Sequence, residues 1–598
     1  MNYFQPYSLP ADQAVLAAWD SQLAELAECP ALVTALAKHR EMLPRFAESY
    51  MRLRALPRGT RRALQRKLAR ARELISIQPE WQRKLAGSLA GAALLLALAQ
   101  SASATTMTVT TNVPDIKRDK KCSLIEAIIN AKKHRRVHTD CPAGSGTDTI
   151  VLPGNTVFTF NKMEPSYIQS YNGLPTVTSI ITIEGNGSTL RRNSKSQFGL
   201  VDVNSTGNLT LKNLTISNWQ DQNFSAITNR GKLTIVSSTI SGNMGYEGGA
   251  IYNSSGAIAA IENSTISGNS ARRGGGIHNY RGTIIINNSS ISQNTAAFSG
   301  GGIRNVGGHA EINNSIISEN RAIAPKYYSG HGGGIDNIGT AAYLLITYSS
   351  IAENLASGGI RSTNKYRPRP AGEGGGIYNG FRSTVTISNS SIFSNTAETP
   401  VNGYIARGGG ILSSAGGDLR ISNSTVSGNT AISGVPAKAY GGGIFSCVFQ
   451  ITSSTIADNR ANVGGGIWSC ESSSRLELAR SIISGNQADK GAEVHNGFSS
   501  SSKQHLAVNN FNLFGNNGDP GVVGVTPGAS DIVPGSGIML DDIIAPLADN
   551  GGPTLTHALA AGSLAIDAAP VDSDCPATDQ RATPRPQGGG CDIGAFEK

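Results

Sequence analysis

Tyrosine, arginine and lysine residues gather in four long segments that link repeated strands between residues 320 and 444. Tyrosine rings can stack on sugars and cations, and an arginine guanidinium can hold a carboxylate or phosphate with two hydrogen bonds. Acidic residues are rare there. The pattern predicts a binding ridge for an extended anionic ligand, formed by Lys326, Tyr327, Tyr328, Arg361, Lys365, Tyr366, Arg367, Arg369, Tyr404, Arg407, Lys438 and Tyr440. Plain solvated loops are the alternative, because surface loops are commonly polar.

Residues suited to acid–base catalysis are sparse. Gly330-His331-Gly332 resembles the Gly-His-Gly segment of polygalacturonases, which also need two carboxyl groups near the scissile bond. The aspartates of the repeat region are instead spread one to a coil, at Asp336, Asp418, Asp458 and Asp489. We therefore expect His331 to lie in a glycine turn and expect no catalytic centre. A β-helix polysaccharide lyase or glycoside hydrolase is the alternative.

Three aspartates near the C-terminus, Asp567, Asp579 and Asp592, could together chelate an ion. Arg581 and Arg585 lie close to them in the sequence. We expect the aspartates to cap turns and to pair with these arginines. The sequence thus predicts neither a metal site nor a cofactor.

A repeated phrase positions all of these residues. It consists of a short apolar strand, then Asn-Ser-Ser/Thr-Ile-Ser-Gly-Asn, a loop, and Gly-Gly-Gly-Ile, and its clearest copy runs from Ile261 to Asn279. Self-similarity at such a period is typical of a solenoid. The apolar segments are short and β-branched, and 70 glycines are too many for a helical repeat. We predict an all-β fold, a right-handed parallel β-helix with a short N-terminal capping helix.

The last asparagine of the phrase is expected to form a structural ladder, in which each amide bonds the equivalent amide of the next coil about 4.8 Å away. Its members are Asn243, Asn269, Asn294, Asn320, Asn354, Asn395, Asn429, Asn459 and Asn486. The four long links follow four successive members of this series. Insertions at one repeat position emerge on one side of a solenoid, which places the predicted ridge on one side.

Six of the seven cysteines form three pairs that are close in sequence. Cys447 and Cys470 each lie three residues after the isoleucine that closes a glycine run, so they hold the same place in adjacent coils. Stacked Cα atoms about 4.8 Å apart can be bridged. We predict the disulfides Cys122–Cys141, Cys447–Cys470 and Cys575–Cys591, which indicate an oxidising compartment.

The chain is expected to begin with a basic helical extension, residues 1–83. Residues 84–104 combine a basic flank, a short apolar run and an Ala-Ser-Ala ending, as expected of a signal peptide cleaved after Ala104 or of a signal anchor. The net charge of +9 is concentrated here, because residues 1–84 hold 14 basic and 8 acidic residues, a net of +6. The remaining +3 excludes a strongly basic nucleic-acid-binding body.

Three motifs mark a family resemblance. Cys122-Ser123-Leu124-Ile125-Glu126-Ala127 resembles the CSLREA motif of bacterial surface β-helix proteins, and Gly248-Gly249-Ala250-Ile251 resembles the repeats of polymorphic outer membrane proteins. The segments 546–567 and 578–597 are similar to the choice-of-anchor Q domain of exported bacterial proteins. Together they imply a capping module at 105–160, β-helix repeats at 161–515 and a choice-of-anchor Q-like module at 516–598.

These features predict an exported bacterial protein, secreted or held at the cell surface or outer membrane. We expect a monomer that meets the export machinery through residues 84–104 and acts in adhesion or glycan recognition, with anionic polysaccharide as the partner and no role for nucleic acid. A structural spacer of the envelope is a further alternative.

Overall fold

The structure is a computed structural model that describes residues 105–163, 172–221, 225–359, 371–400, 405–434, 438–469, 476–497, 508 and 510–598. The predicted helical extension, signal segment and cleavage site at Ala104 lie outside these residues. Within the described part, no helix is long and apolar enough to cross a membrane.

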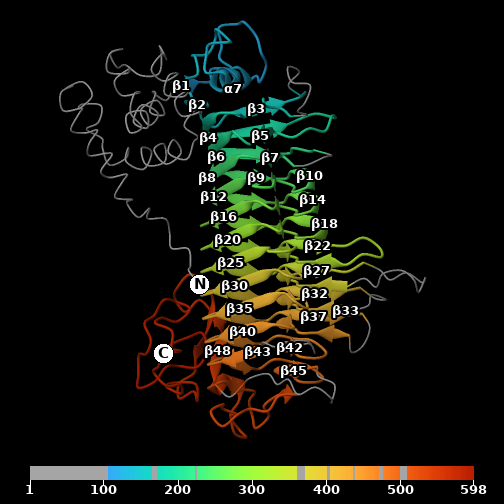
Figure 1. Ribbon diagram of the computed structural model, residues 1–598, viewed down its shortest axis with the longest axis vertical. Helices are drawn as coiled ribbons and strands as arrows, with labels where there is room; N and C mark the ends of the chain where they lie inside the picture. Colours follow the sequence, from blue (N-terminus) through green and yellow to red (C-terminus); the bar gives the residue numbers. More distant parts are fainter. Residues whose placement is uncertain are drawn as a thin grey trace, which may run out of the picture.

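Short parallel strands stack coil upon coil into a rod (Figure 1). The predicted right-handed parallel β-helix is confirmed. Its largest sheet, the main sheet, has 24 strands. They are β1 (Thr105–Thr108), β2 (Thr147–Val151), β3 (Val157–Phe160), β4 (Ile180–Arg192), β6 (Asn208–Ser217), β8 (Lys232–Val236), β9 (Thr239–Ser241), β12 (Ile258–Glu262), β13 (Thr265–Ser267), β16 (Thr283–Asn287), β17 (Ser290–Ser292), β20 (His309–Asn313), β21 (Ile316–Ser318), β25 (Tyr343–Thr347), β26 (Ser350–Ala352), β30 (Thr384–Ser388), β31 (Ser391–Phe393), β35 (Asp418–Ser422), β36 (Thr425–Ser427), β40 (Phe449–Thr452), β41 (Thr455–Ala457), β43 (Leu476–Ala479), β44 (Ile482–Ser484) and β46 (Leu513–Phe514).

A 12-stranded sheet, here called the wall, forms a second side of the rod. It follows each glycine run and consists of β5 (Val201–Val203), β7 (Ile227–Asn229), β11 (Ile251–Asn253), β15 (Ile277–Tyr280), β19 (Ile303–Val306), β24 (Ile335–Ile338), β29 (Ile377–Asn379), β34 (Ile411–Ser413), β39 (Ile444–Ser446), β42 (Ile467–Ser469), β45 (Val494–Asn496) and β47 (Val522–Val523). The closing isoleucines pair with one another in register, as Ile251 does with Ile277, and all are buried. This apolar column fixes the coil-to-coil register.

An 11-stranded sheet, here called the fin, precedes the glycine runs. Three coils contribute single strands, β10 (Met244–Glu247), β14 (Ser270–Arg273) and β18 (Thr295–Ser299). The four coils with long links contribute an outbound and a return strand each. The outbound strands are β22 (Arg321–Ile323), β27 (Leu355–Ser357), β32 (Thr396–Thr399) and β37 (Thr430–Ser433), and the return strands are β23 (Gly330–His331), β28 (Ala371–Glu373), β33 (Ile405–Arg407) and β38 (Ala439–Tyr440).

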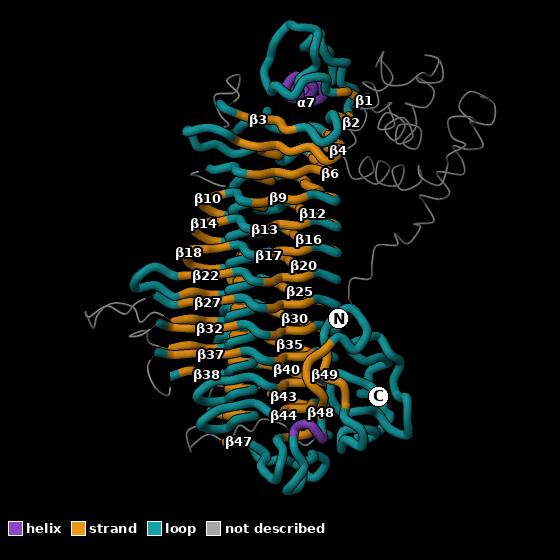
Figure 2. The backbone as a smooth tube through the Cα atoms, turned by 180° about the vertical axis from the view of Figure 1, so that it is seen from behind, coloured by secondary structure: helices purple, strands orange, loops and turns teal. Residues whose placement is uncertain are grey.

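The two layers of the fin pack closely because small residues face each other between them. The outbound layer carries a column of alanines from Ala322 to Ala431, and the return layer carries Gly330, Gly372, Ala406 and Ala439 in register. A Cβ on Gly372 would come within 2.1 Å of the carbonyl oxygen of Glu398. The long links therefore extend as a thin double layer on one side of the rod (Figures 1 and 2).

The single described α-helix, α7 (Leu124–Lys133), covers the N-terminal end of the rod (Figure 2). Ser123 is its N-cap, and the predicted capping box is present: the backbone N–H of Glu126 donates to Ser123 Oγ, and the backbone N–H of Ser123 donates to Glu126 Oε2. The disulfide Cys122–Cys141 ties the helix to the following loop. An amphipathic helix here shields the first coil from solvent.

Asparagine amides bond one another along the inside of the rod. The Nδ2 group of Asn243 donates to Oδ1 of Asn269 at 2.9 Å, and equivalent bonds of 2.8–3.0 Å continue through the series to Asn486. Each backbone N–H also donates to the next Oδ1, as Asn354 does to Asn395 at 3.0 Å. The amides thus satisfy polar groups that the buried turns would otherwise leave unpaired.

Two further ladders were not predicted. A second asparagine ladder runs from Asn229 to Asn379 at the end of the wall strands, with Nδ2–Oδ1 distances of 2.7–3.0 Å. A serine ladder follows the main sheet, where the backbone N–H of Ser264 donates to Oγ of Ser289 and the pattern repeats in neighbouring coils. The serine and the second asparagine both recur from coil to coil, but their spacing in the sequence alone does not reveal which side chains point inward.

The C-terminal segment turns back and packs beside the C-terminal half of the main sheet (Figures 1 and 2). It includes a short 3-10 turn, η2 (Leu540–Asp542), and an antiparallel hairpin of β48 (Ile544–Ala548) and β49 (Thr556–Leu559). Thr425 donates to the side-chain oxygen of Gln580, and the backbone N–H of Ala595 donates to Thr455 Oγ1. The outer face of these strands is therefore covered.

The structure contains the predicted disulfides Cys122–Cys141 and Cys575–Cys591. Cys447 is also disulfide-bonded. Its predicted partner Cys470 lies outside the described residues.

Candidate functional site

The candidate site is a seam of paired side chains at the corner where the fin meets the wall. Each coil supplies one residue directly before its glycine run and one directly after the closing isoleucine or valine. The nine pairs are Glu247/Tyr252, Arg273/His278, Ser299/Arg304, His331/Asp336, Glu373/Tyr378, Arg407/Leu412, Tyr440/Phe445, Val463/Trp468 and Lys490/His495. The first members stack in register along the fin edge and the second members along the wall.

Glycine makes this corner possible. The first glycine of each run has a positive φ, such as 59° at Gly408, and a Cβ there would lie 2.4 Å from the carbonyl oxygen of Ile411. The chain therefore turns so sharply that the residue before the run lies beside the wall strand of the next coil, as Tyr440 does beside Trp468. Side chains from the two columns make contact across the corner as a result.

The N-terminal half of the seam is charged and internally paired. Glu247 accepts from Arg273 at 3.0 Å, lies 2.5 Å from Nδ1 of His278, and lies 3.8 Å from Arg304. Arg304 in turn bonds Asp336 at 3.1 Å. Burial alone would raise the pKa of Glu247, but the hydrogen bond and charge of His278 together with the two arginines lower it.

His331 and Glu373 form the centre of the seam. His331 Nε2 lies 3.2 Å from Glu373 Oε2, its ring stacks on Tyr378 at 4.6 Å, and Arg407 donates to the same carboxylate at 3.1 Å. Burial disfavours the charged imidazole, but the bond to Glu373 raises the pKa of His331 above its ordinary value. Glu373 has a lowered pKa for the reciprocal reason. His331 does precede a glycine turn, but it also belongs to this cluster.

The C-terminal half of the seam is aromatic and cationic. Phe445 and Trp468 stack with ring centroids 4.3 Å apart, and Tyr440 meets Trp468 edge-on at 5.8 Å. The Arg407 guanidinium lies 5.4 Å from the ring centroid of Phe445. Lys490 is exposed at the far end, beside His495. Aromatic rings and cations in a row can bind sugars and anions.

The predicted ridge falls only partly within the described residues. Arg407 and Tyr440 are adjacent in register on the fin and belong to the seam. Lys326, Tyr327 and Tyr328 lie in the link between β22 and β23, where the Tyr328 ring meets Phe298 at 5.1 Å, and Lys438 directly precedes β38. The remaining members, Arg361, Lys365, Tyr366, Arg367, Arg369 and Tyr404, lie outside the described residues. The ridge as a whole remains a prediction.

The C-terminal aspartates take part in turns and one ion pair. Asp579 accepts from the backbone N–H groups of Arg581, Thr583 and Glu597 and pairs with Arg581 at 2.8 Å. Arg585 pairs with Glu597 at 3.2 Å, and reaches Asp592 only through its backbone carbonyl. Among the described residues, no group of three or more His, Cys, Asp or Glu side chains is placed to hold a metal ion.

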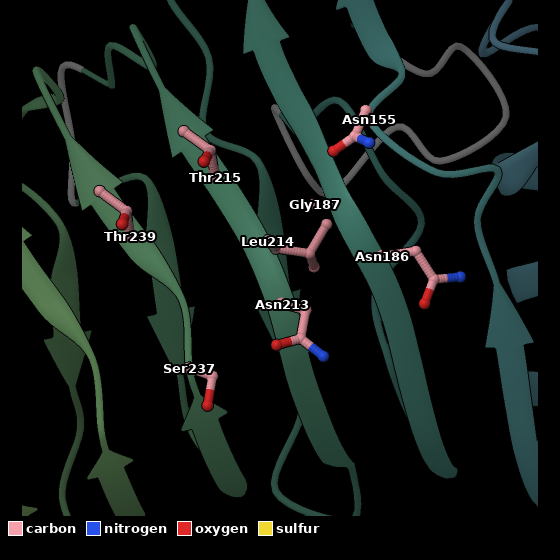
Figure 3. A pocket seen from close by; sticks show the side chains of 8 residues that line it. All are labelled: Asn155, Asn186, Gly187, Asn213, Leu214, Thr215, Ser237 and Thr239. Carbon is pink, nitrogen blue, oxygen red and sulfur yellow. The ribbon is translucent and has the colours of Figure 1, made fainter.

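An open hollow of about 460 Å³ lies on the N-terminal part of the main sheet, at the bend between consecutive strands (Figure 3). Asn155, Asn186 and Asn213 line it with Leu214 and Thr215. It has no ionisable side chain in its lining, so it offers less chemistry than the seam.

Reasoning from the sequence missed the seam. The signal was present, because the two residues that flank each glycine run differ in chemistry from coil to coil while the glycines and isoleucine persist. Only the corner geometry shows that the residue before one glycine run contacts the residue that follows the closing isoleucine of the next coil, as His331 contacts Tyr378. The sequence presents His331 and Asp336 as isolated residues, and Arg407 and Tyr440 as loop residues.

No family model and no curated protein matches this chain. Among solved structures, the crystal structure of pectate lyase Pel9A aligns over 83% of this chain and 98% of its own, with 12% identity and a TM-score of 0.31. The stacked parallel sheets of the structure themselves establish the class, which is the parallel β-helix fold.

Proposed function

We propose that this protein is an exported bacterial β-helix rod that recognises an extended glycan along the corner seam. One observation carries the proposal: two columns of flanking residues run side by side in register over nine consecutive coils, and residues of the first column contact residues of the second one coil further on, as Tyr440 contacts Trp468. With a coil rise of about 4.8 Å, the eight steps between them span about 38 Å. A periodic row of ring and charge contacts of this length suits a polymer better than a compact ligand.

The two disulfides support the exported location, because such bonds persist in oxidising compartments. Export would proceed through the signal segment at 84–104, and the choice-of-anchor Q-like module would serve display at the cell surface or outer membrane. Recognition requires no catalytic step. Within the described part of the seam, each of the three carboxylates is engaged by an arginine or a histidine.

A polysaccharide array probed with the full chain tests the proposal, using neutral and acidic glycans. Arg407→Ala should weaken binding, because Arg407 joins the charged and aromatic halves of the seam. Arg420→Ala is the matched control, since Arg420 is also a half-exposed, carboxylate-paired arginine, but lies on the main sheet. If no glycan binds, the protein is better described as a structural spacer of the envelope.

A further inference from the structure

We infer that the C-terminal half of the seam, from Arg407 to His495, is a subsite for the carboxylate or sulfate groups of an acidic glycan. This inference rests on the proposed function and names the ligand chemistry. Trp468 Nε1–H, the Tyr440 hydroxyl and the Lys490 ammonium have no hydrogen-bond or ion-pair partner among the described residues.

None of the described column positions in the same half holds an acidic side chain. Its eight column positions comprise Arg407, Tyr440, Val463, Lys490, Leu412, Phe445, Trp468 and His495. At the boundary with the N-terminal half, Glu373 accepts from one nitrogen of Arg407 and also bonds His331. A partner for this surface must therefore supply acceptor oxygens and negative charge.

His495 provides an independent observation. It is only 9% exposed, yet its Nδ1 atom has no hydrogen-bond partner in the described part of the chain. A buried polar atom without a partner is costly, so the seam ends at an unsatisfied ring nitrogen. Burial and the neighbouring Lys490 lower the pKa of His495, so the ring is neutral and does not itself attract the anion.

The N-terminal half of the seam shows the contrast. There Glu247, Asp336 and Glu373 neutralise Arg273, Arg304 and His331 within the protein. An acidic ligand placed over that half would meet carboxylates. Charge complementarity therefore places the subsite between Arg407 and Lys490 rather than along the whole seam.

Calorimetry with the full chain tests this assignment, using a uronate oligosaccharide, a sulfated oligosaccharide and the carboxyl-reduced form of the first. Tyr440→Phe and Trp468→Phe each remove one donor and should weaken acidic-ligand binding about 3- to 10-fold, and Lys490→Gln should weaken it about 10-fold at low salt. Tyr343→Phe and Lys232→Gln, on the main sheet, are matched controls and should leave the affinity for all three ligands unchanged.

The outcomes separate the two proposals. If a glycan binds but the three seam variants match the parent, or the carboxyl-reduced ligand binds as well as the acidic one, the subsite is wrong while the proposed function stands. If the sulfated ligand alone responds to Lys490→Gln, the anion is a sulfate ester. If no glycan binds, the proposed function fails. In that case the subsite is tested with sulfate alone, by titrating sodium sulfate at constant ionic strength and following tryptophan fluorescence. The contribution of Trp468 is obtained by subtracting the signal of the Trp468→Phe variant. If Lys490→Gln leaves this sulfate-dependent signal unchanged, the proposed subsite is wrong.

Discussion

Glu493 ends the asparagine ladder and should make the stability of the rod depend on pH. Its Oε2 atom accepts from Nδ2 of Asn486 at 2.5 Å and from the backbone N–H of Asn486 at 3.3 Å, taking the place of the next asparagine. The side chain is buried, and burial raises its pKa to about 8 despite these bonds. A neutral carboxyl group therefore belongs to the folded state.

The direction in which stability changes with pH follows from the linkage between protonation and folding. The folded pKa lies above the model value of 4.5, so the folded protein keeps a proton that the unfolded chain releases. The contribution of Glu493 is fully present below pH 4.5 and is lost as the pH rises through about 8. At about 1.4 kcal/mol per pKa unit, the loss is on the order of 5 kcal/mol across this window.

Glu493→Gln tests the argument because glutamine presents a carbonyl oxygen to Asn486 but does not ionise. The free energy of unfolding, measured by denaturant titration from pH 4.5 to pH 9, should fall more steeply in the parent than in the variant. Glu353→Gln, at an exposed position, is the control and should keep the parent profile. If the parent and Glu493→Gln curves ran parallel within about 1 kcal/mol, the carboxyl would not be the protonated ladder cap described here.

Two further substitutions test the interior of the rod. Asn354→Ala removes the amide that donates to Asn395 and accepts from Asn320, and should lower the free energy of unfolding by roughly 3–6 kcal/mol in a denaturant titration. The control is Asn287→Ala, at a half-exposed position, which should lower the free energy of unfolding by less than about 1 kcal/mol. Gly409→Ala places a Cβ 2.4 Å from the carbonyl oxygen of Gly442 and should lower the thermal midpoint by several degrees, while Gly589→Ala, where no atom lies within 4 Å of the new Cβ, should leave it unchanged. Equal midpoints for the two glycine variants would contradict the close packing of coils at the corner.

The sequence predicts those parts of the rod that permit a single residue type. Asn354 must both donate and accept inside a buried turn, and Gly409 must leave space for the carbonyl of the next coil. Such positions recur unchanged, so their spacing reveals the solenoid and its register. The capping box of Ser123 and Glu126 was predictable for a similar reason, because its contacts are local in sequence.

The seam was not predictable in the same way because its residues are free to vary. Tyr440 and Trp468 are 28 positions apart, and nothing in their spacing states that they meet across a corner. That relation depends on the turn at the glycine run, which brings the residue before it over the next wall strand. Loop length indicated the side from which the fin projects, but not that its return strands would aim Glu373 and Arg407 at the wall.

This division between fixed and variable positions bears on how the rod could recognise a polymer. The ladders, glycines and closing isoleucines hold each coil in register whatever residues flank the glycine run. Successive coils can therefore carry a histidine, a carboxylate, a guanidinium, a phenol or an ammonium at equivalent places without altering the fold. Along one column these are His331, Glu373, Arg407, Tyr440 and Lys490. A catalytic site needs a few groups converging on one bond, whereas a seam that changes its chemistry step by step is suited to reading a ligand along its length. At Arg407 the seam changes from charges that are paired within the protein to donors that are not. The anionic groups of such a ligand would bind from this residue onward.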